Sequence, residues 1–158
     1  MLKSIFPEAF DNTYRGHRLG LWLLYPILFV KIGISLVAIF RPDGGAQSAD
    51  GIPLDAFPSA ASEAVIGVIA ILGLATLVTQ LVGVIAVIRY RAMIPMIYLL
   101  MLAEYLGHRG LDWMKPIARS GGHTGGVVSL VLIALIGLGL VLSLWGRESP
   151  TRHQTATV

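Results

Sequence analysis

Four long apolar runs, separated by polar segments rich in proline, glycine and charge, dominate the pattern of hydrophobic positions along this chain. The runs predict helices over residues 19–40, 63–88, 92–114 and 127–146. The first run is 22 residues long. As a helix it spans about 33 Å, enough to cross the roughly 30 Å hydrocarbon core of a bilayer. The runs do not alternate as membrane β-strands do, so the pattern predicts an all-α, polytopic membrane protein: a single domain with a four-transmembrane-helix bundle.

The segments between the runs predict different kinds of connection. Residues 41–62 hold three prolines, three glycines and three aspartates, so we expect a loop there, with Ser62 capping the next helix. Residues 89–91 are only long enough for a turn, which makes the second and third helices an antiparallel hairpin. Residues 115–126 predict a helix break followed by a glycine-rich linker. Polar segments are expected at the two ends of the chain: residues 1–18 and 147–158.

Composition restricts the class of protein. Hydrophobic residues make up 55% of the 158 residues and charged residues 13%, about half of the roughly 25% that soluble domains carry. A soluble single domain and a disordered chain are therefore excluded, and the lipid bilayer is the expected surrounding. The absence of cysteine excludes disulfide frameworks, zinc–thiolate sites and thiol catalysis. We expect no cofactor, because the sequence holds none of the usual nucleotide-binding, zinc-protease or serine-hydrolase motifs.

The basic residues predict how the chain is oriented. The net charge is +3, but the basic residues lie between the apolar runs, where they orient a membrane protein rather than bind nucleic acid. Seven lie on the side of the termini and the short turn: Lys3, Arg15, Arg18, Arg89, Arg91, Arg147 and Arg152. Four lie on the other side: Arg41, Arg109, Lys115 and Arg119. The positive-inside rule therefore predicts a protein of the bacterial inner membrane with both termini in the cytoplasm.

Two charged residues lie inside the apolar runs, Lys31 in the first and Glu104 in the third. A charge at the centre of a membrane helix costs from about 2.5 kcal/mol upward, so such residues are functional candidates. Each lies 13 residues beyond the arginine that precedes its helix, about 20 Å into the membrane from the same side. Counting 13 residues back from Arg89, at the end of the second run, reaches Thr76. Thr79 and Gln80 lie about one helical turn closer to Arg89. The sequence therefore predicts a polar layer that three helices share.

This layer has three interpretations. Lys31 and Glu104 can form a static ion pair that fixes the register of two helices. Alternatively, the long Lys31 side chain can extend outward toward the membrane surface without pairing. In the functional interpretation Glu104 titrates, Lys31 is its counter-charge, and Thr76, Thr79 and Gln80 line a proton- or ion-responsive site.

The end of the third run carries acidic and imidazole side chains at four-residue spacing: Glu104, His108 and Asp112. These positions share one helix face, and carboxylate and imidazole groups can bind a metal, with His123 of the linker as a further ligand. The ligand set is incomplete, however, and Arg109 opposes a cation. The alternative is an exposed helix end whose charges pair locally with Arg109 and Lys115.

Small residues recur at four-residue spacing in the second and fourth runs: Ala75, Thr79, Gly83, Gly139 and Ser143. Such faces let membrane helices approach one another closely. Because four helices must already pack together, we expect these faces to serve packing within the chain rather than a homodimer seam.

The absence of catalytic motifs favours an integral membrane protein that is not an enzyme, acting as an accessory or scaffolding subunit of a membrane assembly. Its partner would be another membrane protein or further copies of itself. One alternative is a small oligomeric transporter or channel, linked to protons or ions through Lys31 and Glu104. A second is a membrane enzyme or metal site at the outer face that uses Glu104, His108 and Asp112.

Overall fold

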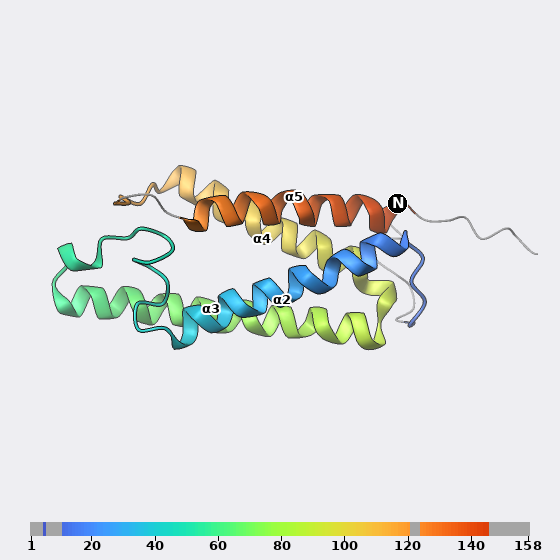
Figure 1. Ribbon diagram of the computed structural model, residues 1–158, viewed down its shortest axis with the longest axis horizontal. Coiled ribbons are helices and arrows are strands. Elements are labelled where there is room, and N and C mark those ends of the chain that lie inside the picture. Colours follow the sequence, from blue (N-terminus) through green and yellow to red (C-terminus); the bar gives the residue numbers. More distant parts are fainter. Residues whose placement is uncertain (1–4, 6–10, 121–123, 146–158) are drawn as a thin grey trace, which may run out of the picture.

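The computed structural model describes residues 5, 11–120 and 124–145, and this part of the chain is helical without any strand. The long helices are α2 (Arg18–Phe40), α3 (Ser59–Arg89), α4 (Ile94–Met114) and α5 (Thr124–Leu144). Two short 3₁₀ helices precede α3 and α4: η1 (Leu54–Ala56) and η2 (Arg91–Met93). The predicted all-α fold class is confirmed, and Figure 1 shows the four long helices extending along the same axis of the molecule.

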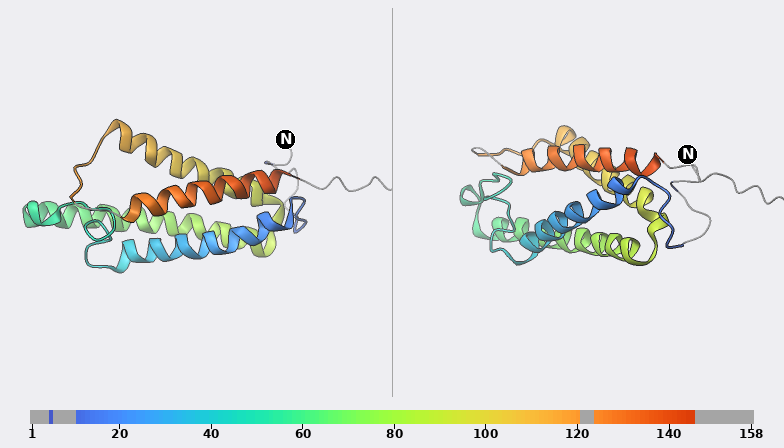
Figure 2. Two further views of the ribbon diagram at one scale, coloured as in Figure 1. Left: turned by 45° about the horizontal axis from the view of Figure 1, so that its top comes forward. Right: turned by 45° about the vertical axis from the view of Figure 1, so that its right-hand side comes forward.

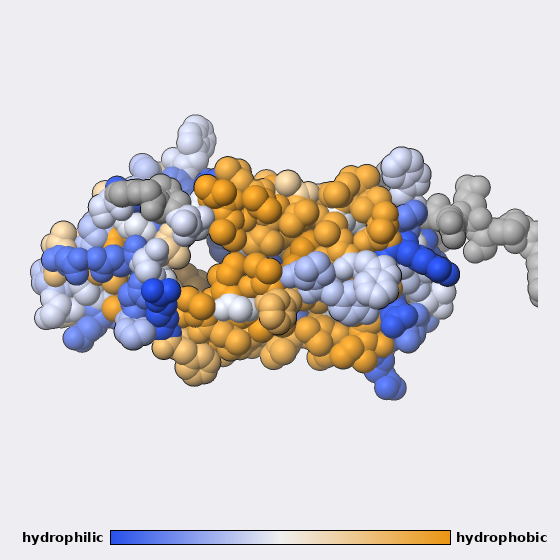
Figure 3. Space-filling model, in the orientation of Figure 1, coloured by the Kyte–Doolittle hydropathy of each residue, from blue (hydrophilic) through white to orange (hydrophobic). Residues whose placement is uncertain are grey.

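Three of the helices are long and apolar enough to cross a membrane: α2, α3 and α5, with 23, 31 and 21 residues. The chain is therefore an integral membrane protein by the length and composition of its helices. Helix α4 is less apolar because its second half carries Glu104, His108, Arg109 and Asp112, so a fourth crossing stays a prediction. On the face that Figure 3 shows, apolar residues gather across the middle of the molecule and polar residues lie at both ends, the distribution that a bilayer requires.

The start of α3 differs from the prediction. The helix begins at Ser59, after Pro58, and Ser62 lies inside its first turn. The Ser62 hydroxyl donates to the carbonyl of Leu54 at 2.9 Å, so the expectation that Ser62 caps the helix is wrong. Pro58 explains the earlier start, because its fixed φ and missing N–H suit the residue at a helix entrance. The hydroxyl instead ties the first turn of α3 back to η1.

The loop after α2 is organised around Asp43. Its carboxylate accepts hydrogen bonds from the backbone N–H of Gly45 at 3.1 Å and of Ser48 at 3.0 Å, and it pairs with Arg41 at 3.1 Å. Gly44 and Gly45 have φ of 60° and 82°, a conformation that glycine adopts without steric cost. The hydrogen bonds from Ser48 are the main cause that lowers the pKa of Asp43 to about 2.

We expect Asp43→Ala to speed amide hydrogen exchange at Gly45 and Ser48 about five-fold, the factor that corresponds to about 1 kcal/mol for a partly exposed hydrogen bond. The folded-state pKa lies below the ordinary value of 3.8. The stabilisation is therefore fully present above about pH 4 and is lost as the pH falls through about 2. Asp43→Asn, which can still accept a hydrogen bond but carries no charge, should remove this pH dependence. Unchanged exchange in Asp43→Ala would contradict the role given to this carboxylate.

The core lies in the half of the molecule that contains the α3–α4 connection. Tyr98 of α4 is fully buried among apolar side chains of α2, α4 and α5, and its hydroxyl donates to the carbonyl of Gly20 at 2.7 Å. Gly139 of α5 lies against the Tyr98 ring, where an added Cβ would overlap the ring atoms. The backbone N–H of His17 donates to the carbonyl of Leu142 at 3.0 Å. This bond holds the start of α2 beside the end of α5 (Figure 1).

Close packing at small residues occurs within the chain at three of the five predicted positions. Ser143 is 3% exposed, and its backbone lies against Gly20. Gly83 faces Leu28, and Gly139 faces Tyr98 as described above, so the predicted internal packing is confirmed there. Ala75 and Thr79 are exposed on α3, and the Thr79 hydroxyl donates to the carbonyl of Ala75 at 3.1 Å. The small-residue face of α3 is therefore only partly used inside the molecule.

The helices do not pack equally along their lengths. Helix α2 packs against both α3 and α5, and α5 also packs against α4. Figure 2 shows that α4 starts within the helical packing and diverges from the other helices toward its C-terminal end. The core is therefore filled near the α3–α4 connection, whereas the C-terminal half of α4 has few neighbouring residues from other helices.

Candidate functional site

The ion pair between Lys31 and Glu104 is the central polar contact of the molecule. Nζ of Lys31 lies 2.8 Å from Oε2 of Glu104 and donates a hydrogen bond to it. The Lys31 side chain is 2% exposed and that of Glu104 is 24% exposed. The structure therefore brings the two charges together, 73 positions apart in the sequence, and Lys31 does not extend outward to solvent.

The surroundings of Lys31 explain how a charge is held between apolar helices. Lys31 lies on the buried face of α2, four residues from both Ile27 and Ser35. The Ser35 hydroxyl donates to the Lys31 carbonyl at 3.0 Å. Nζ also lies 4.6 Å from the centre of the Tyr105 ring, a cation–π distance. The ammonium group therefore has two electrostatic partners on α4, a carboxylate and an aromatic face.

Sequence reasoning did not identify Tyr105 as part of the site. The residue directly follows Glu104, and neighbours along a helix point about 100° apart. A cation that lies between the two side chains can nevertheless contact both. An aromatic residue next to the intramembrane acid was the available signal.

Gln80 of α3 is 0% exposed, and neither its Nε2 nor its Oε1 has a hydrogen-bond partner among the described residues. The position of Gln80 along the bundle, relative to the residues of α2, follows from two glycines on the same face of α3. Gly73 faces the backbone of Ser35, and Gly83 faces the side chain of Leu28. Because α2 and α3 are antiparallel, Gln80 lies at about the level of Lys31. An uncompensated buried amide typically costs about 1–3 kcal/mol.

The predicted layer is thus shifted by one helical turn on α3. Counting from the membrane edge placed Thr76 at the level of Lys31, but the contacts of Gly73 and Gly83 place Gln80 there instead. Thr76 is half-buried, one turn from Gln80. Thr79 faces outward, so the structure does not bring it to the layer. Helix tilt explains the shift, since residue counts assume that all helices stand upright.

The end of α4 shows a different pairing from the one expected. Both carboxylate oxygens of Asp112 accept from Nη2 of Arg119 at 3.3 Å, so its partner is Arg119 rather than Arg109 or Lys115. His108 is exposed. The described ranges contain no group of three histidine, aspartate or glutamate side chains that could hold a metal. The fourth proposed ligand, His123, lies outside the described residues, so the metal site stays a prediction.

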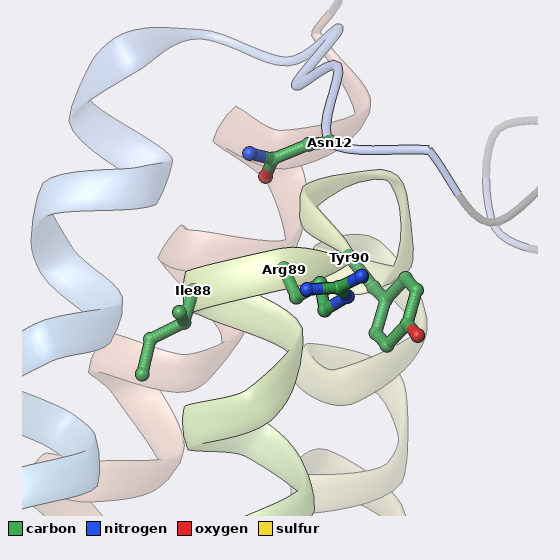
Figure 4. Close-up of a pocket in the computed structure, with 4 residues that line it drawn as sticks. All are labelled: Asn12, Ile88, Arg89 and Tyr90. Carbon is green, nitrogen blue, oxygen red and sulfur yellow. The ribbon is translucent and has the colours of Figure 1, made fainter.

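A cavity lies at the opposite end of the molecule, where α3 passes into α4. It has a volume of about 480 Å³ and is lined by Asn12, Ile88, Arg89 and Tyr90. Figure 4 shows Arg89 and Tyr90 extending together from the end of α3, with Ile88 on the helix flank and Asn12 on the preceding segment of chain. Of these residues, only Arg89 had a predicted role, in orientation, because the cavity depends on where the segment before α2 places Asn12.

The chemistry open to the Lys31–Glu104 pair follows from the unequal exposure of its partners. The Lys31 side chain is buried, so Glu104 is the charged group that compensates its ammonium. The Glu104 side chain is partly exposed at the surface of the molecule. The pair can hold α2 to α4, or it can exchange a proton at the carboxylate. Comparison with known proteins does not choose between these, because no family model, curated protein or solved structure matches the chain.

Proposed function

We propose that this chain is an accessory or scaffolding subunit of a membrane assembly in the bacterial inner membrane, with four crossings and both termini in the cytoplasm. The observation that carries the proposal is the filled interior around Tyr98. Tyr98, Met101 and Ile136 are fully buried together, so side chains of the core occupy the space between the helices in that half of the molecule. A role at the outer helix faces is therefore favoured over conduction through a single chain.

The outer face of α3 is the surface best suited to such a role. Large apolar side chains are exposed along most of its length: Val68, Ile71, Leu74, Val78, Leu81 and Ile85. Helix α3 packs chiefly against α2, so this face is available to lipid or to another membrane helix. The exposed small residues Ala75 and Thr79 lie on the same helix and would allow close approach.

Photo-crosslinking in cells tests this role. A photoreactive residue at Val78, on the exposed face of α3, should give an adduct with one discrete second protein. The same residue at the buried Leu24 is the matched control and should give none. Adducts with lipid alone would overturn the proposal of an accessory subunit, whereas adducts only with further copies of the chain would identify the partner as the chain itself.

Labelling of single cysteines tests the orientation, because the natural chain contains no cysteine. Thr13 and Ser48 are exposed at opposite ends of α2. We expect Thr13→Cys to react only when a membrane-impermeant reagent reaches the cytoplasmic face, and Ser48→Cys to react from outside. The reverse pattern would overturn the orientation but not the helical fold.

A small oligomeric transporter or channel linked to protons or ions is the second candidate. It is favoured by the 24% exposure of the Glu104 carboxylate and by the amide of Gln80 at the same level, which has no partner in the described part of the chain. Proton flux into vesicles that contain the protein tests it. Flux that Glu104→Gln abolishes and Asp112→Asn leaves intact would support this candidate, and absence of flux from the natural protein would exclude it.

Gln80→Met gives a separate expected result. An amide buried without a partner costs about 1–3 kcal/mol, and methionine has a similar shape without polar atoms. We expect the variant to unfold at higher denaturant concentration than the natural protein. Thr79→Val, on the outer face of the same helix, is the control and should change little. A loss of stability in Gln80→Met would contradict this expectation and would show that the amide has a hydrogen-bond partner.

A further inference from the structure

We propose that the cavity formed by Asn12, Ile88, Arg89 and Tyr90 binds the phosphate headgroup of an anionic phospholipid. The occupant is a lipid of the leaflet that meets this end of the bundle. The site is separate from the Lys31–Glu104 pair and does not depend on the proposed function.

The position of the cavity matches the level of lipid phosphates. The apolar run of α3 ends at Ile88, and Arg89 is the last residue of the helix. Ile88 is 67% exposed on the helix flank, as expected for a side chain in contact with hydrocarbon. Tyr90 follows directly, and tyrosine is enriched at the membrane–water boundary. The cavity is thus lined both by an apolar residue, Ile88, and by polar residues, which Figure 4 shows side by side at the end of α3.

The lining chemistry suits a phosphate diester. The Arg89 guanidinium offers a planar set of N–H donors that matches two phosphate oxygens. Asn12 adds an amide donor from the other side of the cavity (Figure 4). The volume of about 480 Å³ is within the range of small-ligand sites, about 300–1,000 Å³.

The balance of charge at this end favours an anion. Among the residues in the described ranges, no carboxylate forms an ion pair with Arg89. Asp11 is the nearest acid along the preceding segment, and its carboxylate already pairs with Arg15 at 3.2 Å. Nε of Arg91 donates to the carbonyl of Val87 at 3.1 Å, which holds Arg91 at the end of α3. Basic groups near a membrane surface attract anionic lipids.

A lipid fits the cavity better than a free phosphate ion. Ile88 continues the cavity wall toward the apolar flank of α3, where an acyl chain would lie. A soluble anion would gain nothing from this apolar side chain, whereas a lipid contacts it and the arginine together.

Native mass spectrometry of the full chain released from detergent tests the proposal. With phosphatidylglycerol and phosphatidylcholine at equal concentration, we expect one phosphatidylglycerol to be retained preferentially. Arg89→Gln should lower this retention about five- to ten-fold, as expected for the loss of one bidentate charged contact. Arg109→Gln, at the other end of the molecule, is the matched control and should retain the lipid.

Further variants distinguish a specific lipid-binding site from non-specific electrostatic attraction. Asn12→Ala leaves the charge unchanged, and we expect it to lower retention about three-fold, in keeping with one lost hydrogen bond. Unfolding of each variant at the same denaturant concentration as the natural protein shows that the fold is intact. Equal retention of the two lipids, or full retention by both Arg89→Gln and Asn12→Ala, would overturn the proposal. Displacement of the lipid by inorganic phosphate at millimolar concentration would reassign the site to a soluble anion.

Discussion

Lys31→Met is expected to lower the free energy of unfolding by about 3 kcal/mol, because it leaves the Glu104 carboxylate unpaired between apolar helices. Glu104→Met should cost more, since Lys31 is 2% exposed whereas Glu104 is 24% exposed. A sealed ammonium group that loses its carboxylate cannot turn toward water, whereas the carboxylate partly can. Lys115→Met removes an exposed cation and is the control, with an expected change below about 0.5 kcal/mol.

The double variant separates the energy of the interaction between Lys31 and Glu104 from the effect of removing each side chain alone. Lys31→Met combined with Glu104→Met replaces both charges by apolar groups, which is often neutral or stabilising for a buried pair. We therefore expect the double variant to be more stable than either single variant and to show a coupling energy above about 2 kcal/mol. Denaturant titration in detergent, followed by tryptophan fluorescence, measures all four proteins. Additive losses would show that the contact does not hold α2 to α4.

The depth of Lys31 and Glu104 could be read from the sequence because of the order of the helices. Helices α2 and α4 start at the same end of the molecule (Figure 1), so equal counts from the preceding arginine correspond to equal levels along the bundle. The long apolar runs also predicted the bounds of the four long helices to within a few residues. The largest difference is the start of α3, at Ser59 instead of Glu63, where a proline overrides the apolar pattern.

The remaining details depend on rotation and tilt, which a single helix does not encode. Whether Thr76 or Gln80 shares the level of Lys31 depends on how α3 crosses α2, and the close approach at Gly73 and Gly83 sets that crossing. The partner of Asp112 could not be found from helix spacing either. Arg119 lies beyond the end of α4, and the segment that follows the helix brings its side chain back to Asp112.

Gly139→Ala is expected to lower the free energy of unfolding by about 3 kcal/mol. An added Cβ would overlap Cε1 and Cζ of the Tyr98 ring, and overpacking of this kind typically costs about 1–3 kcal/mol. The ring cannot move aside freely, because Tyr98 is fully buried and its hydroxyl donates to the Gly20 carbonyl at 2.7 Å. Displacement would also break that hydrogen bond, which places the expected cost at the upper end of the range.

Two further variants show whether the Tyr98 contact is the cause. Gly137→Ala lies two residues away on α5, where an added Cβ meets nothing within 4 Å, so it should be neutral or slightly stabilising. Tyr98→Leu combined with Gly139→Ala makes room for the methyl group, and the alanine should cost less in this background than in the natural protein. Denaturant titration compares the variants. If Gly139→Ala proves as stable as Gly137→Ala, α5 can shift relative to α4, and the close packing of this end of the molecule is not what fixes the helices.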